Sequence, residues 1–229
     1  PRAASLAAAL RRPTVAVIAE VKRRSPSAGS IKEDLDPADR AARYARHGAA
    51  AISVLTDAPY FGGSMGDLRA AAARTRVPVL RKDFILDELQ ILEARAAGAA
   101  AVLLIVRALP PARLTALLAA TAEAELDALV EVHTEDEVRR ALDAGARIVG
   151  VNSRDLDTFR IDTIAAWAML QSMPADIVAV AESGMATEAD VEAAAAAGAD
   201  AVLIGTALSA AADPDALLGR LGRVTRRAR

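Results

Sequence analysis

The sequence predicts an α/β protein, a single (β/α)8 TIM barrel, on three observations. Its 229 residues suit eight βα units in one domain. The pattern Gly-Ala-x-x-apolar, after an alanine-rich stretch, occurs four times at intervals of about 50 residues, the size of two βα units. Short apolar segments alternate with amphipathic ones along the whole chain. We expect the barrel to span residues 15–229, after a shortened N-terminal leader at residues 1–14.

Eight segments rich in apolar and β-branched residues are the predicted strands. Four of them follow the repeat glycines, at which helices are expected to end: Gly48, Gly98, Gly145 and Gly198. The other four are residues 15–21, 77–84, 127–132 and 176–182. Such segments are typical of parallel strands that are buried on both faces. An open, doubly wound sheet is the alternative, but the fourfold repeat and the eight strands favour a closed barrel.

The predicted helices begin at residues that can cap them. An acceptor side chain at the N-cap satisfies free backbone N–H groups of the first turn. Residues of this kind precede four predicted helices: Asp36, Asp87, Thr134 and Thr187. Thr134 with Glu137, and Thr187 with Asp190, have the spacing of capping boxes. Helices that alternate with strands in this way imply right-handed crossovers between parallel strands.

The composition excludes several classes of function. A net charge of −2 and a pI near 5.8 offer no basis for a nucleic-acid or membrane-surface partner, and no obligate protein partner is predicted. The chain has no cysteine, and its two histidines lack a metal-ligand spacing, so we expect no metal site. No apolar run reaches the ~18 residues of a membrane helix. No secretory leader is visible, and these two observations predict a cytoplasmic protein.

The carboxyl ends of the strands meet on one face of a (β/α)8 barrel, and that face carries the active site. Polar, small or aromatic residues follow the predicted strands there: Glu20, Lys22 and Ser25; Phe61; Lys82 and Phe84; Glu131; Asn152 and Arg154; Glu182, Ser183 and Gly184; Gly205 and Thr206. The chemistry of the protein is therefore expected among these side chains.

Two acid–base pairs occur within this set. Glu20 and Lys22 are two residues apart on one strand, so they point to the same side. Lys82 and Glu131 come from alternate strands, which contribute to the same interior layer of the barrel. One such pair could be a structural ion pair. Two pairs at one barrel mouth predict catalysis, because buried charge is costly unless it is paired or functional.

The small residues after the seventh and eighth predicted strands suggest a phosphate site. In barrels these loops often bind phosphate through backbone N–H groups and the N-terminus of a short helix. Ser183-Gly184 and Gly205-Thr206 would let the backbone approach such an anion closely. We therefore predict a phosphorylated small-molecule ligand.

The rare aromatic side chains and the two histidines admit more than one interpretation. Phe61 and Phe84 hint at a flat apolar ligand, although aromatic residues in loops more often form lids or packing contacts. His47 is expected at a helix end, where a partial positive charge is favourable. His133 is expected to make local hydrogen bonds at a helix start.

Six motifs resemble those of indole-3-glycerol phosphate synthases. They are IAEVKRRSPS, SVLTDAPYFGGS, VLRKDFILDELQI, LVEVHTEDE, GVNSRDLDTF, and VAESGM followed by LIGTAL. The motifs occur in order from about Val15 to the end of the chain, so the resemblance covers all eight predicted strands. The family usually has a longer helical leader that covers the active-site mouth, and often a serine where Thr206 stands.

The resemblance implies a carbon–carbon lyase of tryptophan biosynthesis that needs no cofactor. The substrate would be 1-(2-carboxyphenylamino)-1-deoxyribulose 5-phosphate, converted to indole-3-glycerol phosphate by ring closure, decarboxylation and dehydration. Lys82 would be the general acid in ring closure, and Glu131 its acid–base partner in dehydration. Three further residues would assist catalysis: Glu20, Lys22 and Asn152.

The resemblance also implies two sets of binding residues. The substrate-binding set is Ser25, Phe61, Phe84, Arg154 and Glu182, of which the two phenylalanines would flank the anthranilate ring. The phosphate-binding set is Ser183, Gly184, Gly205 and Thr206.

Other functions remain as alternatives. A phosphoribosylanthranilate isomerase would share the phosphate site but use a cysteine and an aspartate, and this chain has no cysteine. Barrel isomerases of the histidine pathway use paired aspartates where this sequence has Glu20 and Glu131. A non-catalytic phosphate-binding barrel would be compatible with a truncated leader, although the two acid–base pairs argue against it.

Overall fold

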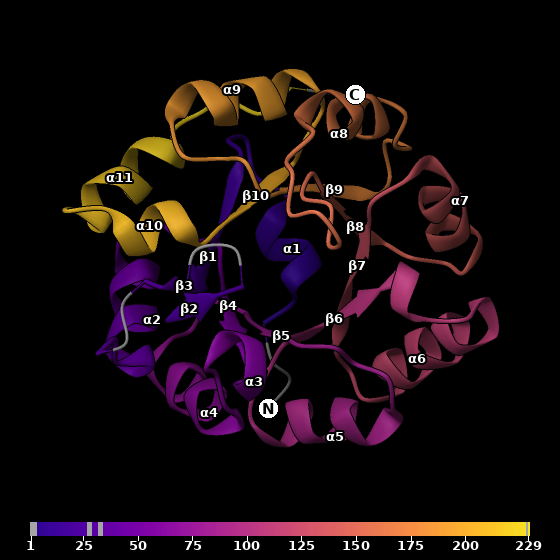
Figure 1. Ribbon diagram of the computed structural model, residues 1–229, viewed down its shortest axis with the longest axis horizontal. Coiled ribbons are helices and arrows are strands. Elements are labelled where there is room, and N and C mark those ends of the chain that lie inside the picture. Colours follow the sequence, from indigo (N-terminus) through magenta and orange to yellow (C-terminus); the bar gives the residue numbers. More distant parts are fainter. Residues whose placement is uncertain (1–3, 27–28, 32–33, 228) are drawn as a thin grey trace.

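A computed structural model describes residues 4–26, 29–31, 34–227 and 229. Eight parallel strands form a closed barrel in the order β1-β10-β9-β8-β7-β6-β5-β4 (Figure 1). Their bounds are β1 Ala16–Val21, β4 Ala51–Leu55, β5 Val79–Lys82, β6 Ala101–Ile105, β7 Asp127–Val132, β8 Ile148–Asn152, β9 Val178–Glu182 and β10 Ala201–Ile204. The first and last strands pair directly, with Ala16 in register with Ala201, so the predicted closed barrel is confirmed over an open sheet.

A ring of helices surrounds the strands (Figure 1). The long helices are α2 Pro37–Arg46, α4 Met65–Arg74, α5 Glu88–Ala96, α6 Pro111–Glu123, α7 Glu135–Asp143, α8 Thr163–Gln171, α9 Glu188–Ala196 and α11 Pro214–Leu221. Shorter elements lie in the connections: α1 Leu6–Leu10, the hairpin of β2 Arg24–Ser25 with β3 Gly29–Ser30, α3 Ala58–Phe61, the 3-10 turn η1 Val106–Ala108, and α10 Thr206–Ala210. None of the described helices is long and apolar enough to cross a membrane.

The repeat glycines end helices, as predicted. Gly48, Gly98, Gly145 and Gly198 follow α2, α5, α7 and α9, with φ angles of +100°, +88°, +91° and +94°. Residues with a Cβ atom rarely adopt this left-handed backbone region, which explains why glycine stands at the same point of each repeat.

The predicted helix caps are largely confirmed. Asp36, Asp87 and Thr187 accept hydrogen bonds from first-turn N–H groups, and the last two belong to complete capping boxes. The capping box predicted for Thr134 and Glu137 is wrong for one of its two hydrogen bonds. Thr134 accepts from the Glu137 N–H, but the Glu137 carboxylate accepts from the backbone N–H of His133, one residue before the cap.

The core has two parts, both almost entirely aliphatic. One part fills the barrel interior, and the other fills the layer between the strands and the surrounding helices. The short helix α1 belongs to the interior part, because Leu6 and Leu10 are fully buried among barrel side chains. Figure 1 shows α1 at the centre of the ring of strands.

Helix α1 closes the amino end of the barrel. Ser5 caps the helix and donates its hydroxyl to Asp127, the first residue of β7, at 2.9 Å. Arg11 donates to the backbone carbonyl of Asp176, just before β9, at 2.6 Å. The leader of the family is expected over the opposite, active-site end, so this segment of residues 5–10 has a different position from the one that the resemblance suggests.

A second closure ties the end of the chain to the same face. Asp200, directly before β10, is buried and contacts Arg226 at 2.5 Å and Arg229 at 3.0 Å. Its carboxylate also accepts from the backbone N–H of Ala179 at 2.8 Å. The carboxylate of Asp200 is therefore paired with the guanidinium groups of both Arg226 and Arg229.

Candidate active site

Buried charged side chains gather at the barrel mouth, the carboxyl ends of the strands. Glu20, Glu131 and Glu182 lie near the ends of β1, β7 and β9, and each is at most 3% exposed. Lys82 is the last residue of β5. We call these four residues the mouth cluster. The structure thus brings together residues that are more than 160 positions apart in the sequence (20 to 182).

Glu20 lies between two lysines. Its carboxylate is 2.8 Å from Lys22 Nζ and 3.7 Å from Lys82 Nζ. Burial by itself would raise the pKa of Glu20, but the two ammonium groups outweigh burial and hold this pKa below its ordinary value. Glu20 is therefore an ionised group that orients both lysines.

Lys82 keeps its proton. Burial would lower the pKa of Lys82, but the carboxylates of Glu20, Glu131 and Glu182 together raise it above its ordinary value. A buried ammonium group at a strand end can stabilise negative charge that develops on a substrate oxygen and then protonate that oxygen.

Glu182 has the opposite tendency to Glu20. Burial raises the pKa of Glu182 well above its ordinary value, the neighbouring Glu131 carboxylate raises it further, and Lys82 only partly opposes the two. Its Oε1 atom is buried without a hydrogen-bond partner among the described residues. Glu182 was predicted as a substrate-binding residue, and the structure places it in the mouth cluster, where the raised pKa favours its protonated form.

Two glycines make room for the buried carboxylates. A Cβ atom at Gly150 would overlap the carboxylate of Glu182, and one at Gly205 would overlap that of Glu20. Gly150 lies on β8, in register with Glu131 on β7. Glu131 and Glu182 therefore face one another across a strand position that has no side chain. The sequence indicated Gly205 only as a phosphate-site residue and did not indicate Gly150.

The predicted residues on β8 and its loop form a connected turn. Asn152 is buried at the end of the strand, and its side-chain oxygen accepts the N–H of Arg154 at 3.0 Å. Arg154 in turn donates to the carbonyl of Phe159 at 3.0 Å. Ser153, between them, donates to the carbonyl of Glu182 at 3.1 Å, which fixes this loop to the end of β9.

The predicted phosphate residues follow neighbouring strands. Leu203 on β10 is in register with Glu182 on β9, so the turns that follow these two strands lie side by side. Ser183 and Gly184 both have positive φ, at +65° and +77°, and Gly205 immediately precedes the short helix α10. Thr206, the first residue of α10, is exposed.

The remaining predicted binding residues lie around the mouth. Phe84 is 39% exposed in the loop after β5. Phe61 is half-buried at the end of α3, where it lines a crevice with Arg23, Gly62 and Asp67. Ser25 belongs to β2, and its side chain lies outside the described part of the molecule.

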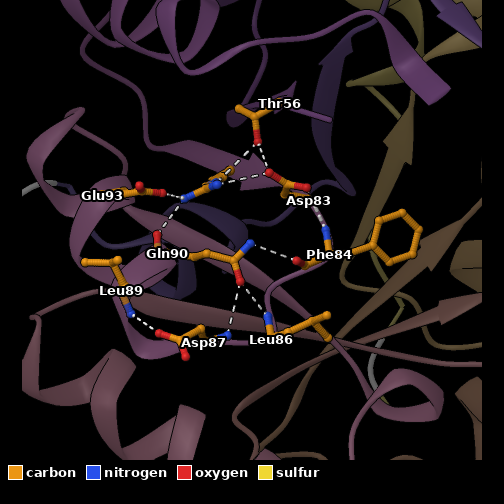
Figure 2. Close-up of polar contacts among 9 residues, drawn as sticks. Thr56, Asp83, Phe84, Leu86, Asp87, Leu89, Gln90 and Glu93 are labelled. Atoms are coloured by element: carbon orange, nitrogen blue, oxygen red, sulfur yellow. Dashed lines mark hydrogen bonds and ion pairs between the residues drawn. The ribbon is translucent and has the colours of Figure 1, made fainter. Parts of the chain in front are cut away.

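Arg81 anchors the strand end that carries Lys82. Successive side chains of a strand point to opposite faces, so Arg81 points away from the barrel interior and is buried against α5. It donates to Asp83 at 3.0 Å and to the carbonyl of Gln90 at 2.6 Å. Asp83 also accepts from the Thr56 hydroxyl at 2.6 Å (Figure 2). The sequence did not indicate this network, because none of its members resembles a site residue in isolation.

Gln90 holds the rest of that loop. Figure 2 shows its side chain between three backbone groups. The amide donates to the carbonyl of Phe84 at 3.0 Å and accepts from the N–H groups of Leu86 at 2.7 Å and Asp87 at 3.1 Å. The loop between Lys82 and α5 is therefore held from its inner side while Phe84 faces solvent.

The ring of His133 contacts the mouth cluster, which the sequence did not indicate. The predicted local hydrogen bond is made by its backbone N–H, to Glu137 at 2.7 Å. The ring itself lies 3.4 Å from the carboxylate of Glu131, and neither of its nitrogens has a hydrogen-bond partner among the described residues. In the described part of the chain, no group of three or more histidine, aspartate or glutamate side chains could hold a metal ion.

A closed barrel with a partly buried lysine and three buried carboxyl groups at its carboxyl strand ends defines a (β/α)8-barrel enzyme with an acid–base active site. The family comparison is more specific. The chain belongs to the indole-3-glycerol phosphate synthase family, whose model matches residues 1–221. This is a family of carboxy-lyases of tryptophan biosynthesis, so the resemblance found in the six motifs is confirmed.

Individual relatives agree with the family match. A protein of Opitutus terrae named indole-3-glycerol phosphate synthase is 49% identical over 225 residues, which are 95% of this chain and 85% of that protein. Indole-3-glycerol phosphate synthase 2 of Streptomyces coelicolor is 53% identical over 214 residues, 93% of this chain and 83% of that protein.

Similar solved structures share the fold at low sequence identity. A 3-hexulose-6-phosphate synthase from Salmonella typhimurium has a TM-score of 0.72 at 17% identity, and the match covers 91% of this chain and 97% of that one. A thiamine phosphate pyrophosphorylase from Pyrococcus furiosus has a TM-score of 0.66 at 18% identity, with coverage of 93% and 95%. These matches support the barrel architecture only.

Proposed function

We propose that this chain converts 1-(2-carboxyphenylamino)-1-deoxyribulose 5-phosphate to indole-3-glycerol phosphate, with loss of CO2 and water. The observation that carries the proposal is the partly buried Lys82 ammonium group among the carboxyl groups of Glu20, Glu131 and Glu182. Ring closure of this substrate requires a proton donor, and Lys82 supplies one at the barrel mouth. The family of the chain is one of such lyases.

Ring closure is the first step. The aromatic carbon that bears the carboxylate attacks the ketone carbon, so a C–C bond forms and the electron pair of the C=O bond moves to oxygen. Bringing these atoms together is mainly a matter of positioning. Lys82 stabilises the growing negative charge and gives the oxygen a proton. The ion pair with Glu20 orients the lysine for this transfer, and Lys22 faces the anionic groups of the substrate.

Decarboxylation and dehydration follow. The C–CO2 bond breaks and its electron pair restores the aromatic ring. The hydroxyl then departs as water, which requires a proton donor for the oxygen and a base for the proton on the neighbouring carbon. Glu131 is the acid–base group in our proposal, and Glu182 beside it, whose pKa is raised, is a second candidate donor. Asn152 holds the reacting centre.

The two ends of the substrate occupy different parts of the mouth in this proposal. The phosphate binds the adjacent turns after β9 and β10, through Ser183, Gly184, Gly205 and Thr206. The aryl ring lies between Phe61 and Phe84, with Ser25 and Arg154 as further contacts. We also propose a cytoplasmic location and no obligate protein partner.

An indole-formation assay tests the proposal. The purified chain is incubated with the carboxyphenylamino substrate, and indole absorbance and fluorescence are followed. We expect turnover without an added metal or cofactor. A sugar-phosphate isomerase would form no indole ring, and a non-catalytic barrel would bind the substrate without change. Binding without indole formation would therefore refute the proposed activity.

A further inference from the structure

The imidazole ring of His133 lies between two carboxylates. Its Nε2 atom is 3.4 Å from Glu131 Oε1, and its Nδ1 atom is 3.5 Å from Glu137 Oε2. The side chain is 6% exposed, and neither ring nitrogen has a hydrogen-bond partner in the described part of the chain. His133 is therefore a buried ionisable group against the mouth cluster, without a role in the steps above.

The local fold explains how the ring reaches this position. Glu131 and His133 are two residues apart at the end of β7, so both side chains point to the same side. Glu137 lies in the first turn of α7, and its carboxylate accepts the backbone N–H of His133. The carboxylate of Glu137 thus lies on the helix side of the imidazole ring, and that of Glu131 lies on the barrel side.

Both nitrogens of the imidazole ring face a carboxylate, so the ring can bridge the two groups. Burial would raise the pKa of Glu137, but the nearby ring and the backbone N–H of His133 outweigh burial and hold this pKa below its ordinary value. Glu137 is thus an anion beside the ring.

The other charged groups around the ring belong to neighbouring elements. Arg107, in η1, acts on Glu137 and is itself paired with Asp157 at 3.3 Å. On the inner side, Lys82 and Glu182 lie beyond Glu131 in the mouth cluster. The ring is thus a link between the outer carboxylate of α7 and the proton-transfer groups of the barrel mouth.

We propose that His133 is a positioning residue for Glu131: held between the carboxylates of Glu131 and Glu137, its ring fixes the direction of the Glu131 carboxylate. This inference rests on the proposed function, because Glu131 is the acid–base group of that reaction. His133 acts through Glu131 and does not contact the substrate.

Kinetic analysis of two variants tests the positioning role. We expect His133→Leu to lower kcat roughly tenfold, less than the ~10²–10⁴-fold expected for loss of an acid–base group itself, with KM nearly unchanged. His133→Asn keeps a buried donor and should recover part of kcat. The matched control is His47→Asn, which changes the other, outer histidine and should leave kcat unaltered.

A measurement without turnover separates this inference from the proposed function. The chain has two histidines, so ring ¹⁵N shifts give two sets of signals, and His47→Asn assigns them. We expect the ring signals of His133 to shift in Glu131→Gln, because the ring loses a charged neighbour 3.4 Å away, with those of His47 unaffected. His133 ring signals that do not respond to Glu131→Gln would overturn the inference, even if indole forms normally. Unchanged kcat in His133→Leu would overturn it as well.

Discussion

Charged side chains are paired differently at the two ends of this barrel. At the amino end, Asp200 is satisfied by two arginines and a backbone N–H, and the leucines of α1 fill the space between the strands. At the carboxyl end, two lysines face three carboxylates, and one oxygen of Glu182 lacks a partner in the described part of the chain. The difference indicates that one end stabilises the fold, whereas the other keeps reactive groups available.

The largest effect should come from removing the central cation of the mouth. We expect Lys82→Ala to lower kcat on the order of 10²–10⁴-fold, because the substrate oxygen loses its proton donor. The fold should persist, which circular dichroism and a melting curve would check. Near-wild-type indole formation in this variant would contradict the assignment of Lys82.

A substitution in α1 tests the role of the amino end of the barrel. Leu10→Ala removes a fully buried side chain of α1 and should lower the free energy of unfolding by about 2–5 kcal/mol. Denaturant unfolding measures this loss, and kcat per folded molecule should stay constant. A large fall in kcat at full folding would show that the two ends are coupled and would break the comparison.

Gly150 offers a smaller and more local change. A methyl group there would displace the Glu182 carboxylate, so Gly150→Ala should reduce kcat and cost roughly 1–3 kcal/mol of stability through overpacking. The control is Gly219→Ala on α11, where a Cβ meets open space. That variant should gain up to about 1 kcal/mol from helix propensity and keep its kcat. Equal effects of the two substitutions would contradict a special role for Gly150.

The smallest expected effect is a pH dependence of stability. The pKa of Glu182 is raised in the folded state, so folding takes up a proton above the unfolded pKa. The contribution of Glu182 to stability is complete below the unfolded pKa and is lost as the pH rises through the folded pKa. Glu182→Gln should therefore lose less stability than the wild type as the pH rises above the unfolded pKa, which urea unfolding measures. Parallel curves would indicate that folding does not raise the pKa of Glu182.

The polar strand ends and the two acid–base pairs could be predicted from the sequence, but most other contacts across the barrel could not. Glu131 interrupts an apolar run and Lys82 stands at the end of one, a signal that one segment contains by itself. Gly150 also lies in such a run, but its small size matters only because Glu182 approaches from the next strand. The ring of His133 and the network of Arg81 were missed for the same reason: both depend on contacts between elements.

The segments that flank the barrel also pair with one another. The backbone N–H of Val15 donates to the carbonyl of Val224 at 2.8 Å, and that of Arg226 donates to the carbonyl of Pro13 at 3.1 Å. The path of the polypeptide from Pro13 to Arg226 is therefore nearly a circuit. A domain whose first and last segments lie close together suits circular permutation, in which these segments are joined and new ends are opened in a surface loop. A permuted chain that opens a loop at the amino face should keep all eight strand ends, and with them the mouth cluster, in place.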